Sequence, residues 1–291
     1  MPENISTIPT IPISSTDPLR ISWLALRGLG SSEDNNRREM CTLEKRGNVY
    51  ILTLTGAGEH RLNPNLLDSI QSALRRLHAE PANPSSVLIT TAEGKFFSNG
   101  YDLAWAETPS AVAAASATPG GQNPFQLMSA KLRSVVADLI TLPMPTIAAV
   151  TGHAAAAGFI LALSHDYVLM RRDRGFIYMS EVDIGLVVSA WFMSVLKCKI
   201  GDAAARRDLV LRAAKVTAGA AAERGIVHSA HDSAEGTLAA AVELGEELAR
   251  RKWNGHVYAR NRMVMMGEVL EKIGFDETVE GQNGNKIKAH L

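Results

Sequence analysis

Two short turns of small residues, followed by one acidic residue, are the parts of this sequence best suited to chemistry on a carbonyl group. The first turn, residues 96–103, reads FFSNGYDL, and the second, residues 152–158, reads GHAAAAG. Each is expected to lead from a strand into a helix. Small residues let a ligand approach the backbone closely, and the first amides of a helix have no partner within the helix and carry partial positive charge. Two such turns side by side would offer two N–H donors to one developing oxyanion.

Other chemical motifs are missing from the sequence. It contains no G-x-x-x-x-G-K-[ST] phosphate loop, no H-E-x-x-H metal helix and no G-x-S-x-G nucleophile turn. The GAG at residues 56–58 lacks the third glycine of a dinucleotide fingerprint and is better explained by a hairpin turn. His228 and His231 lie three residues apart, but no carboxylate or thiol cluster completes a metal-ligand set.

The composition fits a globular protein that does not bind nucleic acid. The 291 residues include 30 Lys plus Arg and 30 Asp plus Glu, so the net charge is zero, whereas proteins that neutralise phosphates carry a basic surplus. No run reaches the roughly 18 apolar residues that a membrane span needs. Cys41 and Cys198 cannot form a disulfide framework and fit a reducing compartment or simple buried thiols.

The hydrophobic pattern alternates strands with helices, which predicts an α/β fold with parallel pairing in the first part of the chain. Residues 111–122 are predicted to form a mobile loop. The expected strands are residues 41–44, 49–54, 87–90, 146–150, 167–170 and 176–178. The expected helices are residues 64–78, 125–142, 203–212, 218–224, 233–251 and 256–273.

The two ends of the chain differ from its middle. Residues 1–39 are rich in Pro, Ser and Thr without a period, which favours a disordered extension, with an organelle presequence as the alternative. The last three residues, Ala289, His290 and Leu291, are a conservative variant of the Ser-Lys-Leu peroxisomal address. We therefore expect an import receptor among the partners and a peroxisomal location.

The two turns resemble those of the crotonase, or enoyl-CoA hydratase/isomerase, superfamily. FFSNGYDL is similar to its F-x-[AS]-G-x-D-[LI] turn, and residues 148–159, AAVTGHAAAAGF, are similar to its A-x-[NT]-G-x-A-x-G-G-G turn. A later segment, residues 222–227, resembles its A-x-x-x-G-[LI]-V sequence. The three motifs are in register over about residues 41–273. The segments MCTLEKRG and KFFSNGYDLAWA most resemble the plant peroxisomal Δ3,Δ2-enoyl-CoA isomerases.

The resemblance implies a β-β-α superhelix over residues 40–200, with a helical oligomerisation region over residues 201–291 that would form a homotrimer or hexamer. It implies an acyl-CoA thioester as substrate and no cofactor or metal beyond the CoA of the substrate. The oxyanion donors would be the backbone amides of Tyr101 and Ala157. Ala156 and Ala157 replace glycines of the family motif, and their methyl groups would narrow the room for the thioester. The substrate-binding residues would be Ser98, Asn99, Gly100, Ala156, Gly158, Phe159, Ile160, Leu186 and Trp191.

Glu181 falls on the position where the family supplies a catalytic glutamate, and Asp183 is the rival base. Hydratases of the family add a second glutamate where this chain has Ile160. A single carboxylate suits a 1,3 proton shift, so the resemblance implies an isomerase that acts in β-oxidation of unsaturated fatty acids. We expect an apolar pocket that raises the pKa of Glu181, lined by residues such as Ile184. The alternatives are a hydratase or dienoyl-CoA isomerase of the same fold, or a non-catalytic acyl-CoA-binding relative.

Overall fold

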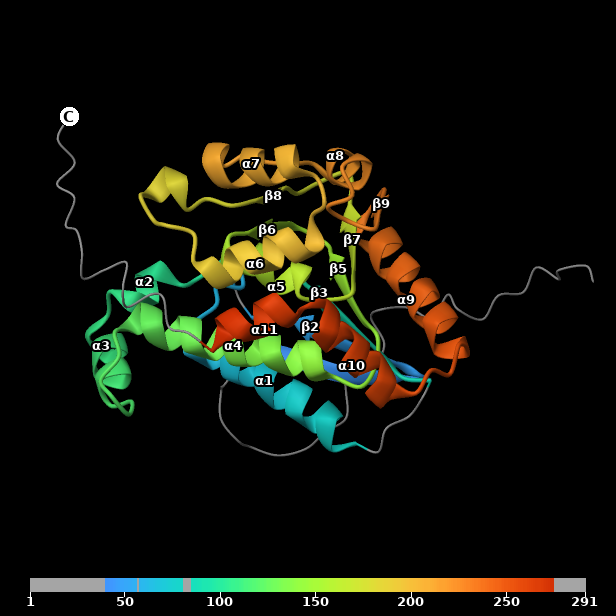
Figure 1. Ribbon diagram of the computed structural model, residues 1–291, viewed down its shortest axis with the longest axis horizontal. Helices are drawn as coiled ribbons and strands as arrows, with labels where there is room; N and C mark the ends of the chain where they lie inside the picture. The colour runs from blue at the N-terminus through green and yellow to red at the C-terminus, as the bar shows by residue number, and fades with distance from the viewer. Residues whose placement is uncertain (1–39, 57, 81–84, 275–291) are drawn as a thin grey trace, which may run out of the picture. The chain divides into compact units, whose positions relative to one another are not determined.

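The computed structural model describes residues 40–56, 58–80 and 85–274 (Figure 1). By its contacts the chain divides into residues 1–37 and residues 38–291, and all described residues belong to the second unit. The predicted extension over residues 1–39 and the C-terminal tripeptide lie outside the described residues.

A six-stranded sheet runs through the described part of the chain, in the order β1-β2-β3-β5-β7-β9. β1 and β2 are antiparallel, and every other neighbouring pair is parallel. All residues of β3 are buried, as expected for a parallel strand covered on both faces. The strands are β1 (Cys41–Arg46), β2 (Val49–Leu54), β3 (Val87–Ala92), β5 (Thr146–Val150), β7 (Tyr167–Arg171) and β9 (Ser229–His231).

A second, smaller sheet consists of three parallel strands in the order β4-β6-β8: β4 (Phe96–Ser98), β6 (His153–Ala155) and β8 (Ile177–Tyr178). Each of them follows directly in sequence on a strand of the large sheet, namely β3, β5 and β7. Because helical residues come after each such pair, the chain repeats a strand–strand–helix unit. The predicted β-β-α superhelix is thus confirmed.

Helices cover both faces of the large sheet. Residues that alternate along β2 divide between two hydrophobic clusters, with Val49 and Ile51 in one and Tyr50, Leu52 and Leu54 in the other. The cluster with Val49 is closed by α9 (Ala234–Arg250), which packs on β3, β5 and β7. On the other face α1 (Pro64–Ala79) and α4 (Pro124–Thr141) run side by side (Figure 1). The remaining helices are α2 (Leu103–Ala106), α3 (Pro109–Ser116), α5 (Ala157–Leu163), η1 (Val182–Ile184), α6 (Ala190–Lys199), α7 (Ala203–Arg212), α8 (Ala218–Glu223), α10 (Gly255–Met265) and α11 (Gly267–Ile273).

The structure differs from the sequence-based expectation in three places. The mobile loop predicted over residues 111–122 is wrong, because α3 occupies much of it, capped by the Thr108 hydroxyl, which accepts from the Ala111 amide at 3.1 Å. The single helix expected over residues 256–273 is two helices that meet at Met266. The pattern also missed α6 and β9. No helix of the described residues is both long and apolar enough to cross a bilayer.

Candidate active site

The two small-residue turns lie against each other, at the carboxyl ends of the neighbouring parallel strands β4 and β6. An ideal Cβ built on Gly100 would lie 3.5 Å from the Ala157 nitrogen and 3.2 Å from the Ala155 oxygen. One built on Gly158 would lie 2.4 Å from the Ser98 oxygen, so no side chain fits there. The glycines therefore let the two turns come close enough to act on one ligand.

Tyr101 lies where the first turn enters α2. Its position is fixed by a parallel bridge to Leu62, in which the Leu62 amide donates to Gly100 at 2.8 Å and the Asp102 amide donates to Leu62 at 3.4 Å. The Asp102 carboxylate accepts from the Trp105 amide at 3.0 Å and caps α2. Asp102 therefore orders the turn.

Ala157 is the first residue of α5, where a backbone amide has no partner within the helix. The preceding residue, Ala156, is held by its own amide, which donates to the Tyr178 oxygen at 2.9 Å. This bond links the end of β6 to the end of β8. The structure thus brings the two predicted donors, Tyr101 and Ala157, to adjacent strand ends.

Ala156 adopts a backbone conformation that normally requires glycine, with φ 47° and ψ −123°. A non-glycine residue held in such a region costs about 1–3 kcal/mol, because the Cβ crowds its own backbone. The sequence shows the alanine at this position but does not reveal its dihedral angles. The site therefore stores strain beside one of its candidate donors.

Glu181 follows β8, the third strand of the small sheet, so it lies three residues beyond the Tyr178 that contacts Ala156. The residue is 7% exposed, and its Oε2 has no hydrogen-bond partner among the described residues. Burial raises the pKa of Glu181, and hydrogen bonds from the backbone at Glu181 and Ser180 offset this only in part. A buried carboxyl with a raised pKa and an unengaged oxygen is typical of a general base.

Asp183, the rival base, lies in η1 and is exposed to solvent. Ile184 and Leu186, expected around Glu181, are also exposed, at 51% and 41%. The Leu186 amide donates to the backbone oxygen of Glu181 at 2.8 Å. The backbone of this loop thus folds back on Glu181, while the side chains of Ile184 and Leu186 are exposed. The geometry favours Glu181 over Asp183 as the acid–base group.

Ser98 and Asn99 are engaged with the protein itself. The Ser98 hydroxyl donates to the His60 oxygen at 2.8 Å, and the Asn99 amide group donates to Glu59 at 2.6 Å. The side chain of Ser98 therefore supports the turn rather than reaching outward. Phe159 and Ile160 are fully buried in α5, within the main core.

The start of α6 adds an aromatic wall beside the first turn. Trp191 is 2% exposed and meets Phe192 edge-on, with ring centroids 4.4 Å apart. The Phe192 ring in turn stacks on Tyr101 at 6.3 Å. Trp191 was predicted from the sequence as a substrate-binding residue, but Phe192 was missed because α6 was not recognised. Ser189, a residue type favoured at a helix start, could have indicated that α6 begins there.

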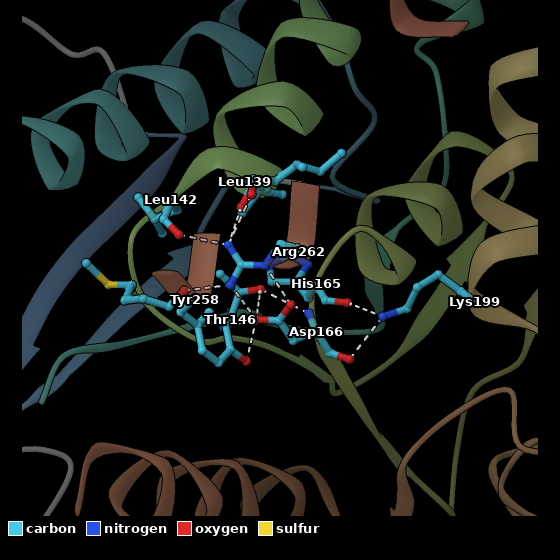
Figure 2. Close-up of polar contacts among 10 residues, drawn as sticks. Leu139, Leu142, Thr146, His165, Asp166, Lys199, Tyr258 and Arg262 are labelled. Atoms are coloured by element: carbon cyan, nitrogen blue, oxygen red, sulfur yellow. Dashed lines mark hydrogen bonds and ion pairs between the residues drawn. The ribbon is translucent and has the colours of Figure 1, made fainter. Parts of the chain in front are cut away.

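A buried polar cluster lies at the opposite end of α5, around Asp166 (Figure 2). The Asp166 carboxylate accepts from the Arg262 Nε at 2.7 Å, from the Thr146 amide at 2.9 Å and from the Tyr258 hydroxyl at 3.3 Å. Lys199 donates to the backbone oxygens of His165 and Asp166 at 2.7 and 3.0 Å. Burial alone would raise the pKa of Asp166, but Arg262 more than offsets this, and the pKa is lowered.

Arg262 also closes the end of α4. Its guanidinium donates to the backbone oxygens of Leu139, Leu142 and Met144 at 3.1, 2.8 and 2.6 Å. One side chain of α10 thus ties together the end of α4, the start of β5 and the residues that follow α5. The pairing of Asp166 with Arg262 was not predicted from the sequence.

The described residues contain no group of three or more His, Cys, Asp or Glu side chains placed to hold a metal ion. His228 directly precedes β9, and His231 is the last residue of this strand. The His231 ring contacts the Ser229 hydroxyl at 2.8 Å. These two histidines therefore do not share a helix face.

Known proteins resemble this chain over most of its length. The model of the enoyl-CoA hydratase/isomerase family matches residues 44–272. The chain is 59% identical to the peroxisomal enoyl-CoA delta isomerase 1 of Arabidopsis thaliana over 231 residues, which cover 79% of this chain and 91% of that protein. It is 52% identical to the peroxisomal enoyl-CoA delta isomerase 2 of the same plant, over 82% of this chain and 98% of that protein.

Solved structures share the fold at low identity. An enoyl-CoA isomerase of Mycobacterium tuberculosis superposes with a TM-score of 0.70 at 18% identity, covering 84% of this chain and 99% of that one. An enoyl-CoA hydratase/isomerase family protein of Pseudomonas syringae gives 0.69 at 20% identity, covering 84% and 97%.

Proposed function

The chain belongs to the enoyl-CoA hydratase/isomerase family, and we propose that it is a Δ3,Δ2-enoyl-CoA isomerase. It converts 3-cis- or 3-trans-enoyl-CoA to the conjugated 2-trans-enoyl-CoA. This assignment agrees with the names of the Arabidopsis relatives. The reaction serves the β-oxidation of unsaturated fatty acids.

The reaction needs one carboxylate and two hydrogen-bond donors. The Glu181 Oε2 removes a proton from C2 of the substrate, which is acidified by both the thioester and the neighbouring double bond. The dienolate that forms carries its charge largely on the thioester oxygen, which accepts from the amides of Tyr101 and Ala157. The protonated Glu181 then delivers the same proton to C4, and the double bond moves to C2–C3.

The observation that carries the proposal is the buried, unengaged oxygen of Glu181 at the end of β8, next to the paired turns at the ends of β4 and β6. A raised pKa suits a group that must both accept and return a proton. Ile160, where hydratases of the family have a second glutamate, is fully buried in the core, which supports isomerisation over hydration.

The test is turnover of trans-3-hexenoyl-CoA by the purified protein, followed by the absorbance of the conjugated enoyl thioester. We expect isomerisation much faster than the formation of 3-hydroxyacyl-CoA from 2-trans-hexenoyl-CoA. Faster hydration would identify a hydratase, and isomerisation only of a dienoyl-CoA would identify that alternative. Binding of acyl-CoA without any turnover would indicate a non-catalytic relative.

The proposed location is the peroxisome, since two of the Arabidopsis relatives are named peroxisomal. The import-receptor contact through Ala289, His290 and Leu291 and the assembly into a homotrimer or hexamer stay predictions. A fluorescent fusion that loses its punctate pattern when the three residues are deleted would support the first. Light scattering of the purified protein tests the second, and a monomeric mass would contradict it.

A further inference from the structure

Ala156 has a strained backbone and directly precedes Ala157, one of the two candidate donors. It is partly exposed, while its neighbours Ala155 and Ala157 are buried. An ideal Cβ on Gly100 would lie 3.3 Å from the Ala156 Cβ and 3.5 Å from the Ala157 nitrogen. The Ala156 methyl group, which belongs to the second turn, therefore faces Gly100 of the first turn.

The methyl group occupies this place only because the residue accepts an unfavourable backbone conformation. Of the described non-glycine residues with positive φ, two are alanines, Ala156 at φ 47° and Ala213 at φ 46°. Ala213 ends α7 in the left-handed region, at φ 46° and ψ 36°. Ala213 shares the positive φ but lies outside the turns of the site. Replacing it by glycine therefore relieves backbone strain without removing a methyl group from the site, which makes it a control for the same change at Ala156.

The substrate atoms nearest this methyl group follow from the proposed function, on which this inference rests. In the proposed mechanism the thioester oxygen accepts hydrogen bonds from the Tyr101 and Ala157 amides. The thioester carbon is therefore one covalent bond away from an oxygen held at this site. That carbon is also bonded to sulfur, which is present in every CoA thioester, and to C2. Substituents on C2 are thus the variable groups closest to the Ala156 methyl group.

We propose that the Ala156 methyl group is a specificity determinant, which selects 3-enoyl-CoA substrates that are unbranched at C2 over those with a methyl group there. A C2-methyl substrate still has one C2 proton that Glu181 can move to C4, so the chemistry itself does not exclude it. Its exclusion is steric, and one extra carbon in a closely packed site typically changes kcat/KM by about 10- to 200-fold.

The experiment compares kcat/KM for trans-3-hexenoyl-CoA and racemic 2-methyl-trans-3-hexenoyl-CoA in the wild type, Ala156→Gly and Ala213→Gly. We expect the ratio of branched to unbranched substrate to rise roughly tenfold or more in Ala156→Gly and to stay at the wild-type value in Ala213→Gly. Both variants should have a higher melting temperature, because glycine relieves positive φ.

A binding measurement separates this inference from the proposed function. Calorimetry with hexanoyl-CoA and 2-methylhexanoyl-CoA needs no turnover, and Ala156→Gly should narrow the difference in Kd between them. If the wild type does not isomerise 3-hexenoyl-CoA but binding still shows this change, the proposed function fails and the steric role stands. An unchanged preference in both assays, or an equal change in Ala213→Gly, would overturn the inference.

Discussion

At the scale of single residues, Glu181 is placed where its charge is unfavourable for folding but would serve the proposed acid–base role. Its pKa is raised by burial, so above that pKa the folded protein holds a carboxylate that the unfolded chain would solvate better. As the pH falls below the raised pKa of Glu181, the folded protein takes up a proton at this carboxyl and the buried charge disappears. This group therefore destabilises the fold at neutral pH, and the effect fades as the pH falls.

Replacing Glu181 by Gln should separate the two roles. We expect kcat to fall by about 10²- to 10⁴-fold, the usual contribution of a general acid–base group. The free energy of unfolding at pH 7 should rise, because the amide carries no charge to bury. Steady-state kinetics and urea titrations of both proteins measure the two effects. Isomerisation at the wild-type rate by the Gln variant would show that another group moves the proton.

The pH dependence of the reaction should report the same residue. Because the proposed mechanism needs an ionised Glu181 to remove the C2 proton, kcat/KM should decline as the pH falls through the pKa of this residue, which burial raises above that of an ordinary glutamate. The profile of kcat/KM against pH checks this, with Asp183→Asn as the control. An acidic limb that moves in the Asp183 variant would assign the base to that exposed carboxyl instead.

Glu181, Tyr101 and Ala157 were selected through the family resemblance, and the motifs that carry this resemblance are local features of the sequence. The strain at Ala156 was not predictable in this way, since it depends on the bond from its amide to Tyr178 on another strand. Arg262 was missed for a similar reason. Its partner Asp166 is distant in sequence, and an arginine in a helix ordinarily faces solvent.

At the scale of elements, Arg262 connects α10 to the ends of α4 and α5. Its side chain is 2% exposed and that of Asp166 is 11% exposed, so loss of one partner leaves a buried charge without its counter-ion. The same side chain satisfies the last backbone oxygens of α4, which have no partner within the helix.

Replacing Arg262 by Met should therefore lower the free energy of unfolding by about 3–5 kcal/mol. Arg262→Lys should be intermediate, because an ammonium cannot reproduce the planar set of donors. The double variant with Asp166→Asn should be less destabilised than the sum of the single variants, since the unpaired carboxylate is removed. Chemical denaturation of the wild type, the three single variants (Arg262→Met, Arg262→Lys and Asp166→Asn) and the double variant of Arg262→Met with Asp166→Asn tests this, and simple additivity would contradict the proposed coupling.

The elements themselves were predictable where their pattern was strong. Residues 146–150 and 203–212 were predicted with the bounds that β5 and α7 have. The run of Ala, Ser and Thr after Thr108 has little contrast between apolar and polar positions, so α3 was taken for a loop. β9 is three residues long and gains its partners only from β7, which no local pattern reveals.

At the scale of the whole molecule, the strand–strand–helix repeat was predictable only through the family resemblance. The hydrophobic pattern gave parallel strands but not their division into two sheets, because β4, β6 and β8 are two or three residues long. The long-range pairing that assembles them depends on contacts between turns, and these contacts are absent from any single window of sequence.

The stability of the whole domain should fall in mild acid. Burial lowers the pKa of His165 to about 4, and its ring contacts the Leu161 oxygen and the Thr90 hydroxyl. Since the unfolded chain protonates this residue near pH 6.5, its contribution is complete above that pH and is lost as the pH falls toward 4. The loss amounts to about 3 kcal/mol over this range.

Melting temperatures between pH 7 and pH 4 measure this effect. His165→Gln should be less stable at pH 7 but should show a flatter decline toward pH 4. A variant with the same slope as the wild type would assign the acid sensitivity to other groups.

The proposed active centre would draw its two donors and its proton carrier from three separate strand ends, at Tyr101, Ala157 and Glu181. No contiguous stretch of the chain holds all of them, so a partly folded intermediate with one or two strand–strand–helix units in place would have no competent centre. During refolding from denaturant, recovery of enzymatic rate should accordingly lag behind the return of helical circular dichroism, and it should coincide with the last cooperative step.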